Sequence, residues 1–372
     1  MGRPEAGPGR RCDDGWTGAG PATGSGADAM KAVPVCLAMV ILAVTLRAAT
    51  AAPPIDPAAL AARIIERHVV PRYRALTDAA ATLNAAARRS CAPADMSALR
   101  SSFAAVMDAW MAVQHIRFGP AMREDRHVRV QYWPDKHNQL SRQLGRLLDA
   151  ADDAALAPDR FAAATVALQG LPAIERLIHH DGPPASRGGA FGCRLIAAIA
   201  GNLRAIAASA LAEWQALPAD ETAAEGLVDS LMTQLQVIGE LKLLRPLGAD
   251  ASSARPRLAE SWRSARSGRN IRINIEALAD LYSGAAGADL RTVAAAADDG
   301  QGRLEGLDDG FAVAVRTAAR PDDGLAPDLA DDRRRRTVRF LAVHLSGLRE
   351  LMAVTVAPAM GVTLGFNALD GD

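Results

Sequence analysis

Apolar residues recur at spacings of three and four along most of the chain after residue 56, and this spacing predicts amphipathic helices. Strand patterns, in which apolar and polar residues alternate, are nearly absent. In chain order, the expected helical segments are 57–87, 96–118, 134–148, 158–178, 191–217, 222–244, 270–282, 289–320 and 331–356. Pro71 is expected to kink or split the first segment, because proline has no amide hydrogen to donate. The pattern therefore predicts an all-α fold.

A polar segment rich in glycine and proline, residues 180–184, interrupts the helical pattern and divides it in two. The four helical segments before it are joined by short connections, which is typical of a helical bundle. Further helical segments follow it. We therefore expect two helical-bundle domains, at residues 52–182 and 183–372.

Residues 30–51 have the features of a signal peptide: a basic residue, an apolar run and an Ala-x-Ala cleavage site. The apolar run is shorter than the roughly 20 residues of a membrane-spanning helix. Cys36 lies inside this run rather than at its end, which argues against a lipid anchor. Residues 1–29 show no periodicity and are expected to be disordered or to precede the true start at Met30. The mature chain is therefore expected in the periplasm.

Basic and acidic side chains are equal in number, with 42 of each, so the formal net charge is zero. Such a chain has no net electrostatic attraction to nucleic acid, and we expect only peripheral association with a membrane. Hydrophobic residues at 49% and charged residues at 23% are typical of a globular protein. The sequence contains no glycine-rich phosphate loop, no Gly-x-Ser-x-Gly and no Cys-x-x-Cys.

Two of the four cysteines, Cys91 and Cys193, remain once the predicted signal is removed. In an oxidising compartment a lone pair of cysteines favours a disulfide. It would close a loop of about 100 residues and contribute on the order of 4 kcal/mol by the chain-entropy relation. Two buried free thiols are the alternative.

Residues 170–175 read Gly-Leu-Pro-Ala-Ile-Glu inside an apolar run. They resemble the Gly-x-His-x-x-Glu signature of the imelysin-like family of bacterial envelope proteins, with Pro172 at the histidine position. Four other segments are similar to that family: Trp-Met-Ala-Val-Gln-His-Ile-Arg-Phe-Gly-Pro at 110–120, Trp-Pro-Asp at 133–135, Arg-Ser-Ala-Arg-Ser at 263–267 and the ending 365–372. Together they span almost the whole predicted mature chain. The chain is therefore identified as a member of the imelysin-like family (peptidase M75), in its predicted periplasmic branch.

This resemblance implies two all-α bundles with the signature near the cleft between them. It also implies either metallopeptidase activity or a role in iron uptake. A metallopeptidase needs metal ligands and a general base, as in His-Glu-x-x-His, and that motif does not occur in the sequence. We therefore expect the cleft to bind a small ligand, namely iron, another divalent or trivalent metal, or an iron complex. Envelope iron-uptake proteins are the implied partners.

Two other functions stay open at this point. One is a metal-dependent peptidase of the imelysin type, with Glu175 as base or ligand. The other is a structural envelope protein whose site has decayed, with Pro172 as the trace of that decay.

Glu175 and His179 are the candidate metal ligands, because side chains four residues apart share a helix face. Pro172 inside a helix would also free a backbone carbonyl, which could bind a metal or water. The alternative is that Glu175 pairs with an arginine and that His179 ends a helix in solvent.

Trp110, His115 and Arg117 are expected at the cleft, where histidine and arginine would bind a carboxylate or another anion. The alternative places Trp110 and His115 in the core and makes Arg117 the structural partner of Glu175.

Arg266 and Arg269, with Ser267 between them and Arg263 before them, form the densest group of donors in the predicted mature chain. Guanidinium groups at this spacing suit bidentate binding of a carboxylate, a phosphate or a ferric chelate. The alternative is that they bind helix-end carbonyls and acidic side chains across the domain interface.

Overall fold

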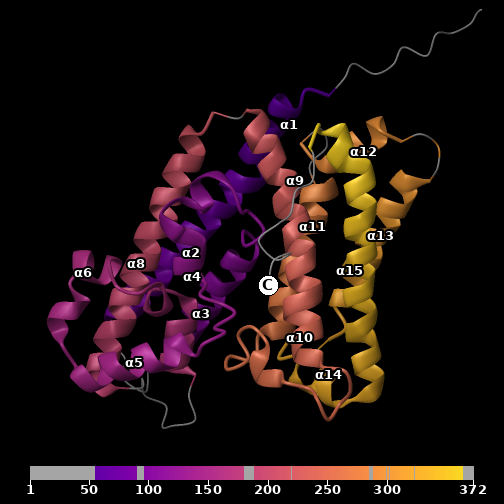
Figure 1. The fold of residues 1–372 in the computed structure, drawn as a ribbon. Helices are drawn as coiled ribbons and strands as arrows, with labels where there is room; N and C mark the ends of the chain where they lie inside the picture. The colour runs from indigo at the N-terminus through magenta and orange to yellow at the C-terminus, as the bar shows by residue number, and fades with distance from the viewer. Residues whose placement is uncertain are drawn as a thin grey trace, which may run out of the picture. The chain divides into compact units, whose positions relative to one another are not determined.

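The structure, a computed structural model, describes residues 55–89, 96–179, 188–218, 220–284, 288–298, 300, 302–321 and 323–362. These residues form helices and connections and contain no strand, which confirms the predicted all-α fold (Figure 1). The predicted signal peptide, the segment 180–184, Cys91 and the ending 365–372 lie outside the described residues.

The helices follow one another as the apolar pattern predicts, with more interruptions. Up to residue 179 the elements are α1 (Pro57–Ile64), η1 (Ile65–Val69), α2 (Val70–Arg89), α3 (Met96–Met111), η3 (Gly119–Ala121), η4 (Arg123–Asp125), α4 (Arg126–Val130), α5 (Gln139–Ala150), η5 (Asp153–Leu156), α6 (Pro158–Ala162), η6 (Val166–Leu168) and α7 (Leu171–Ile178). From residue 188 they are α8 (Gly189–Ala216), α9 (Glu221–Gln236), η7 (Val237–Leu244), α10 (Arg245–Leu247), η8 (Pro256–Leu258), α11 (Ser267–Ser283), α12 (Leu290–Ala296), α13 (Arg303–Ala318), α14 (Ala326–Ala330) and α15 (Asp332–Ala359).

Long helices pack along one another in two groups. Helix α2 packs against α3 and α8, and α15 packs against α13, α9 and η7 (Figure 1). The two groups are joined by α1, which packs on α9, and by α3, which packs on α11. By length and composition α8 and α15 could cross a membrane, but both pack along other helices here. The predicted division at residue 182 stays a prediction.

Two helices widen into π-helix immediately before a proline. In η1 the Val70 amide donates to the Ile65 carbonyl, five residues back, and Pro71 follows. In η7 the Arg245 amide donates to the Glu240 carbonyl, and Pro246 follows. A wider turn relieves the clash between the proline ring and the carbonyl four residues before it. Pro71 therefore splits the first predicted helix by a π-turn, and the helix continues.

The segment 158–178 is broken where the apolar pattern predicts one helix. It forms α6, η6 and α7, so Pro172 stands in the first turn of α7 and not inside a helix. Proline is well suited to this position, because the first amides of a helix have no intrahelical acceptor. The prediction that Pro172 frees a helix carbonyl was wrong for this reason.

Gly170 precedes α7 at a point where two backbones meet. A Cβ atom at this residue would lie 2.4 Å from the Val130 carbonyl oxygen and 2.6 Å from that of Arg129. The absence of a side chain therefore lets α7 begin against the end of α4, and this contact fixes the position of the signature helix.

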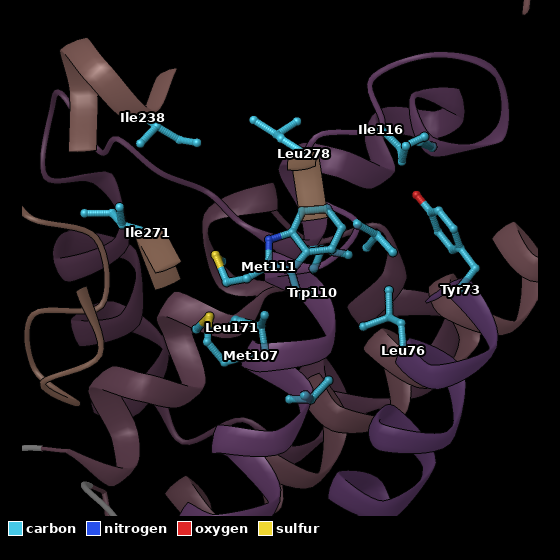
Figure 2. Packing of buried hydrophobic residues seen from close by; sticks show 14 of the residues in the cluster. Tyr73, Leu76, Met107, Trp110, Met111, Ile116, Leu171, Ile238, Ile271 and Leu278 are labelled. Atoms are coloured by element: carbon cyan, nitrogen blue, oxygen red, sulfur yellow. The ribbon is translucent and has the colours of Figure 1, made fainter. Parts of the chain in front are cut away.

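The core lies around α3. Figure 2 shows side chains of α3 in the middle of the buried cluster, with residues of α2 to one side and residues of η7 and α11 to the other: Met107, Trp110, Met111, Tyr73, Leu76, Ile238 and Ile271. All are buried. Because α3 contacts both α7 and α11, its packing sets the distance between the signature helix and the segment before α11.

Candidate functional site

A cavity of about 880 Å³ opens beside α7. Five parts of the chain line it: α7 with the following His179, the segment 131–141, the loop 257–263, Arg100 of α3 and Arg245 of α10. Its charged side chains are five arginines and two carboxylates: Arg100, Arg176, Arg245, Arg257, Arg263, Asp135 and Glu175. Its volume falls in the range typical of pockets for small molecules.

Glu175 lies at the inner wall of this cavity and is 5% exposed. Its Oε1 atom accepts hydrogen bonds from the Ser264 amide at 2.8 Å and from the Ser264 hydroxyl at 2.7 Å. Burial raises the pKa of Glu175, and the two bonds from Ser264 and the nearby Arg263 oppose this rise. The carboxyl group is therefore held in place by a loop that lies 89 residues later in the chain.

The loop that holds Glu175 has a tight backbone. Ser261 and Ala265 have φ angles of 52° and 53°, in the left-handed region that residues with a side chain rarely adopt. The Arg266 amide donates to the Ser261 carbonyl at 3.1 Å, which closes the turn around Ser264. Strained residues of this kind persist where the surrounding structure fixes them, and they cluster at functional sites.

Pro172 also lines the cavity, three residues before Glu175 in α7. Side chains three apart share a helix face, so the signature position does face the same space as the carboxylate. Proline gives this position an apolar ring without a donor or acceptor. Position 172 therefore adds no metal-binding or hydrogen-bonding atom of its side chain beside Glu175.

His179 lines the cavity as well, but it has left the helix. It is the C-cap of α7, with φ −118° and ψ 81°, and its amide donates to the Glu175 carbonyl at 2.8 Å. Burial and the neighbouring Arg100 and Arg266 lower the pKa of His179 to about 4. Among the described residues, no three histidine, cysteine or acidic side chains gather in a way that could hold a metal ion. The metal pair of Glu175 and His179 stays a prediction.

The arginines of the cavity come from separate elements. Arg100 on α3 donates twice to the Ile178 carbonyl, at 3.0 and 2.8 Å, and so caps the end of α7. The guanidinium groups of Arg257 and Arg263 lie 5.5 and 4.2 Å from the centre of the Trp262 ring. Arginine on an aromatic ring is held by a cation–π attraction. The cavity is therefore cationic, with an aromatic wall.

Arg266 and Arg269 do not line this cavity. Both bind Asp108 on α3: Arg266 forms an ion pair with it, and Arg269 donates to both carboxylate oxygens, at 2.8 to 3.2 Å. The Ser267 hydroxyl donates to the Glu260 carbonyl at 2.7 Å. The two arginines thus hold the start of α11 against α3, and Ser267 ties it to the preceding loop, which corresponds to the structural alternative for this motif.

Trp110, His115 and Arg117 do not line the cavity: the first two are buried in the core, and Arg117 is half-buried. Trp110 packs edge-on against His127, with the ring centres 5.0 Å apart. The Nε2 atoms of His115 and His68 are 2.9 Å apart, and burial lowers the pKa of His115 to about 3. Burial also lowers the pKa of Arg117 to about 10, opposed by Glu260.

A buried ion pair behind the cavity escaped the sequence analysis. The Lys242 ammonium, 1% exposed, donates to the Glu260 carboxylate at 2.8 Å and to the side-chain oxygens of Gln114 and Asn274, both at 2.6 Å. Gln131, which lines the cavity, donates to Glu260 at 3.3 Å. A single lysine in the apolar run 237–244 was the available signal, since buried lysines need a partner.

The prediction for the cysteines has partial support. Cys193 is disulfide-bonded. Its predicted partner Cys91 lies outside the described residues, so the pairing stays a prediction.

Comparison with known proteins agrees with this architecture. An imelysin-like protein from Psychrobacter arcticus has a similar structure, with a TM-score of 0.68 and 18% sequence identity, over 83% of this chain and 97% of that one. A protein from Parabacteroides distasonis, named provisionally as an iron-regulated protein A precursor, has a TM-score of 0.63 and 14% identity, over 82% of this chain and 97% of that one. A search of curated proteins found no match. The sequence model of the imelysin family, Peptidase M75, matches residues 69–352, and the chain therefore belongs to the imelysin family.

Proposed function

We propose that this protein is exported to the periplasm and binds a small anionic ligand in the cavity beside α7. The observation that carries the proposal is the cavity itself, in which the signature carboxyl of Glu175 lies among five arginines. An iron complex is the first candidate ligand, because one structural neighbour is named as iron-regulated. The predicted signal peptide at residues 30–51 supports export.

A bare metal ion fits this cavity poorly. Its three potential ligands are Glu175, His179 and Asp135, and they do not converge on one point among the described residues. The Asp135 carboxylate already accepts hydrogen bonds from the backbone amides of Gln139 and Leu140, at 2.7 and 3.0 Å. The surrounding guanidinium groups would repel a free cation. A metal wrapped in carboxylates presents negative charge, which these arginines can bind.

Calorimetric titration of the mature chain with ferric citrate tests the proposal. Micromolar or tighter binding is expected for the wild type. Binding at least tenfold weaker is expected for Glu175→Gln, because the variant removes the carboxylate that would serve as a ligand of the chelated iron or as the acceptor of a hydrogen bond from the complex, and such a bond to a charged group contributes about 1.5–3 kcal/mol. Glu305→Gln, an exposed change on α13, is the matched control and should bind like the wild type. Titration with Fe(II) and Zn(II) alone measures the metal without its chelator.

Two results would overturn the proposal. If neither ferric citrate nor the metals bind the wild type, the cavity is not a site for this class of ligand. The remaining function is then that of a structural envelope protein whose site has decayed. If the protein hydrolyses casein and both a chelator and Glu175→Gln abolish the hydrolysis, the metal-dependent peptidase is the correct function.

A further inference from the structure

We infer that the ligand is a hydroxy-polycarboxylate, and that Arg245 and Arg257 recognise its acid groups with or without a bound metal. The inference rests on the proposed function and adds the chemical class of the ligand. It also moves the main binding contacts from Glu175 to two arginines that no sequence motif contains. Three observations carry it. Arg245 and Arg257 lack carboxylate partners, two guanidinium groups lie over the Trp262 ring, and a buried amide oxygen of the cavity wall lacks a donor.

The first observation concerns the partners of the cavity arginines. Arg245 begins α10 and is half-buried, and among the described residues it makes no hydrogen bond or ion pair through its side chain. Arg257 is exposed, and its described side-chain contact is the ring of Trp262. By contrast, Arg266 and Arg269 outside the cavity both bind Asp108. Two cations of one cavity thus lack the carboxylate partners that the neighbouring arginines have.

The second observation is that two guanidinium groups meet one aromatic ring. Arg257 and Arg263 both lie over Trp262, so this part of the cavity wall carries two positive charges on one aromatic ring. Arg263 also acts on Glu175, whose pKa it lowers against the effect of burial. An acid group bound by Arg257 and Arg245 would leave the relation between Arg263 and Glu175 intact and would offset the positive charge of Arg257 and Arg245.

The size of the cavity argues against a single small anion. Arg245 and Arg257 come from different elements, α10 and η8, and line a space of about 880 Å³. One phosphate or acetate would fill a small part of that volume. A ligand with several carboxylates can bind both arginines at once, and the planar fork of guanidinium matches the planar carboxylate in two parallel hydrogen bonds.

The third observation is an acceptor without a donor. Gln131 is 5% exposed and lines the cavity, and its Oε1 atom has no hydrogen-bond partner among the described residues. Its Nε2 atom donates a hydrogen bond to the Glu260 carboxylate, and this bond fixes the orientation of the amide. A buried acceptor of this kind is costly unless a ligand donates to it. A ligand hydroxyl between carboxylates supplies that donor, and hydroxy-polycarboxylates such as citrate have this chemistry.

The test is calorimetric titration of the mature chain with metal-free citrate, tricarballylate, phosphate and pyrophosphate. Citrate is expected to bind, and Arg245→Gln and Arg257→Gln should each weaken its binding at least tenfold, as expected for a lost charge-assisted hydrogen bond. Arg74→Gln, an exposed change on α2, should bind like the wild type. Tricarballylate lacks the hydroxyl, so its affinity should be at least about threefold lower than that of citrate. Arg257 is exposed, so its variant tests the site without disturbing the core.

The outcomes separate this inference from the proposed function. If ferric citrate binds in a manner that depends on Glu175, while metal-free citrate does not bind and both arginine variants bind normally, the inference is wrong and the proposed function stands. If pyrophosphate or phosphate binds as tightly as citrate, the assignment of a polycarboxylate is wrong. If tricarballylate binds as tightly as citrate, the role of the hydroxyl is wrong. If no ligand binds, both proposals fail.

Discussion

Replacing Lys242 by methionine is expected to destabilise the protein by about 3 kcal/mol, the lower end of the 3–5 kcal/mol typical of a broken buried ion pair. Lys242 and Glu260 are 1% and 2% exposed, so the variant leaves a carboxylate in the interior without its ammonium partner. Glu260 keeps some compensation, because the amides of Gln114 and Asn270 donate to it at 3.0 Å each. Arg117 also acts on it electrostatically, which is why we expect the lower value.

The measurement is a double-mutant cycle in urea, with unfolding of the mature chain followed by circular dichroism at neutral pH. Glu260→Gln removes the other charge, and the variant with both changes buries neither. The double variant should therefore be at least about 1.5 kcal/mol more stable than the sum of the single losses predicts. Additive losses, or a loss below about 1 kcal/mol for Lys242→Met, would refute a buried ion pair at this position.

Three other changes test features described above. Gly170→Ala should cost about 1–3 kcal/mol in urea unfolding, because its Cβ would overlap the backbone of residues 129 and 130, whereas Gly145→Ala meets open space and should not destabilise. Pro172→His places an imidazole beside Glu175 and should tighten Zn(II) binding at least tenfold by calorimetry; the same affinity as in a Pro158→His control would contradict a ligand position at 172. Stability should fall as the pH drops from 6.5 toward 3, because burial lowers the pKa of His127 to about 3 and the unfolded chain takes up protons near 6.5. The loss is about 1.4 kcal/mol per pH unit for such a histidine, and His127→Gln should flatten the measured profile.

The helices could be predicted from the sequence because their apolar positions recur with the period of the α-helix. The break between α6 and α7 could not, because the residues on either side keep that period while Gly170 packs against a backbone 40 residues earlier in the chain. Contacts of this kind depend on the fold and leave no local pattern. The same holds for His179, which the spacing places on the face of Glu175 but which caps the helix instead.

The cavity could be predicted only where a motif runs through it. Glu175 was found because the family signature contains it, and it does line the cavity. Arg245 and Arg257 belong to no motif, because each stands beside a proline between two predicted helices, 222–244 and 270–282. Arg266 and Arg269 were predicted to bind a ligand because arginines are dense in that segment. They bind Asp108 instead, which lies more than 150 residues earlier in the chain. The sequence shows how many donors a segment has and does not show which acceptor meets them.

The two π-turns also affect how changes in chain length act on this protein. A π-turn holds about one residue more than an α-turn, so it rotates every later side chain by roughly 100° relative to the preceding helix. The residues before and after η7 are thus in two different phases, and Lys242 lies within the transition. Deleting one residue between 237 and 244 would merge the phases into one continuous α-helix. Either the part before the deletion or the part after it would then present a polar stripe to the core. In this protein, insertions and deletions near η1 and η7 are therefore changes of orientation as much as changes of length.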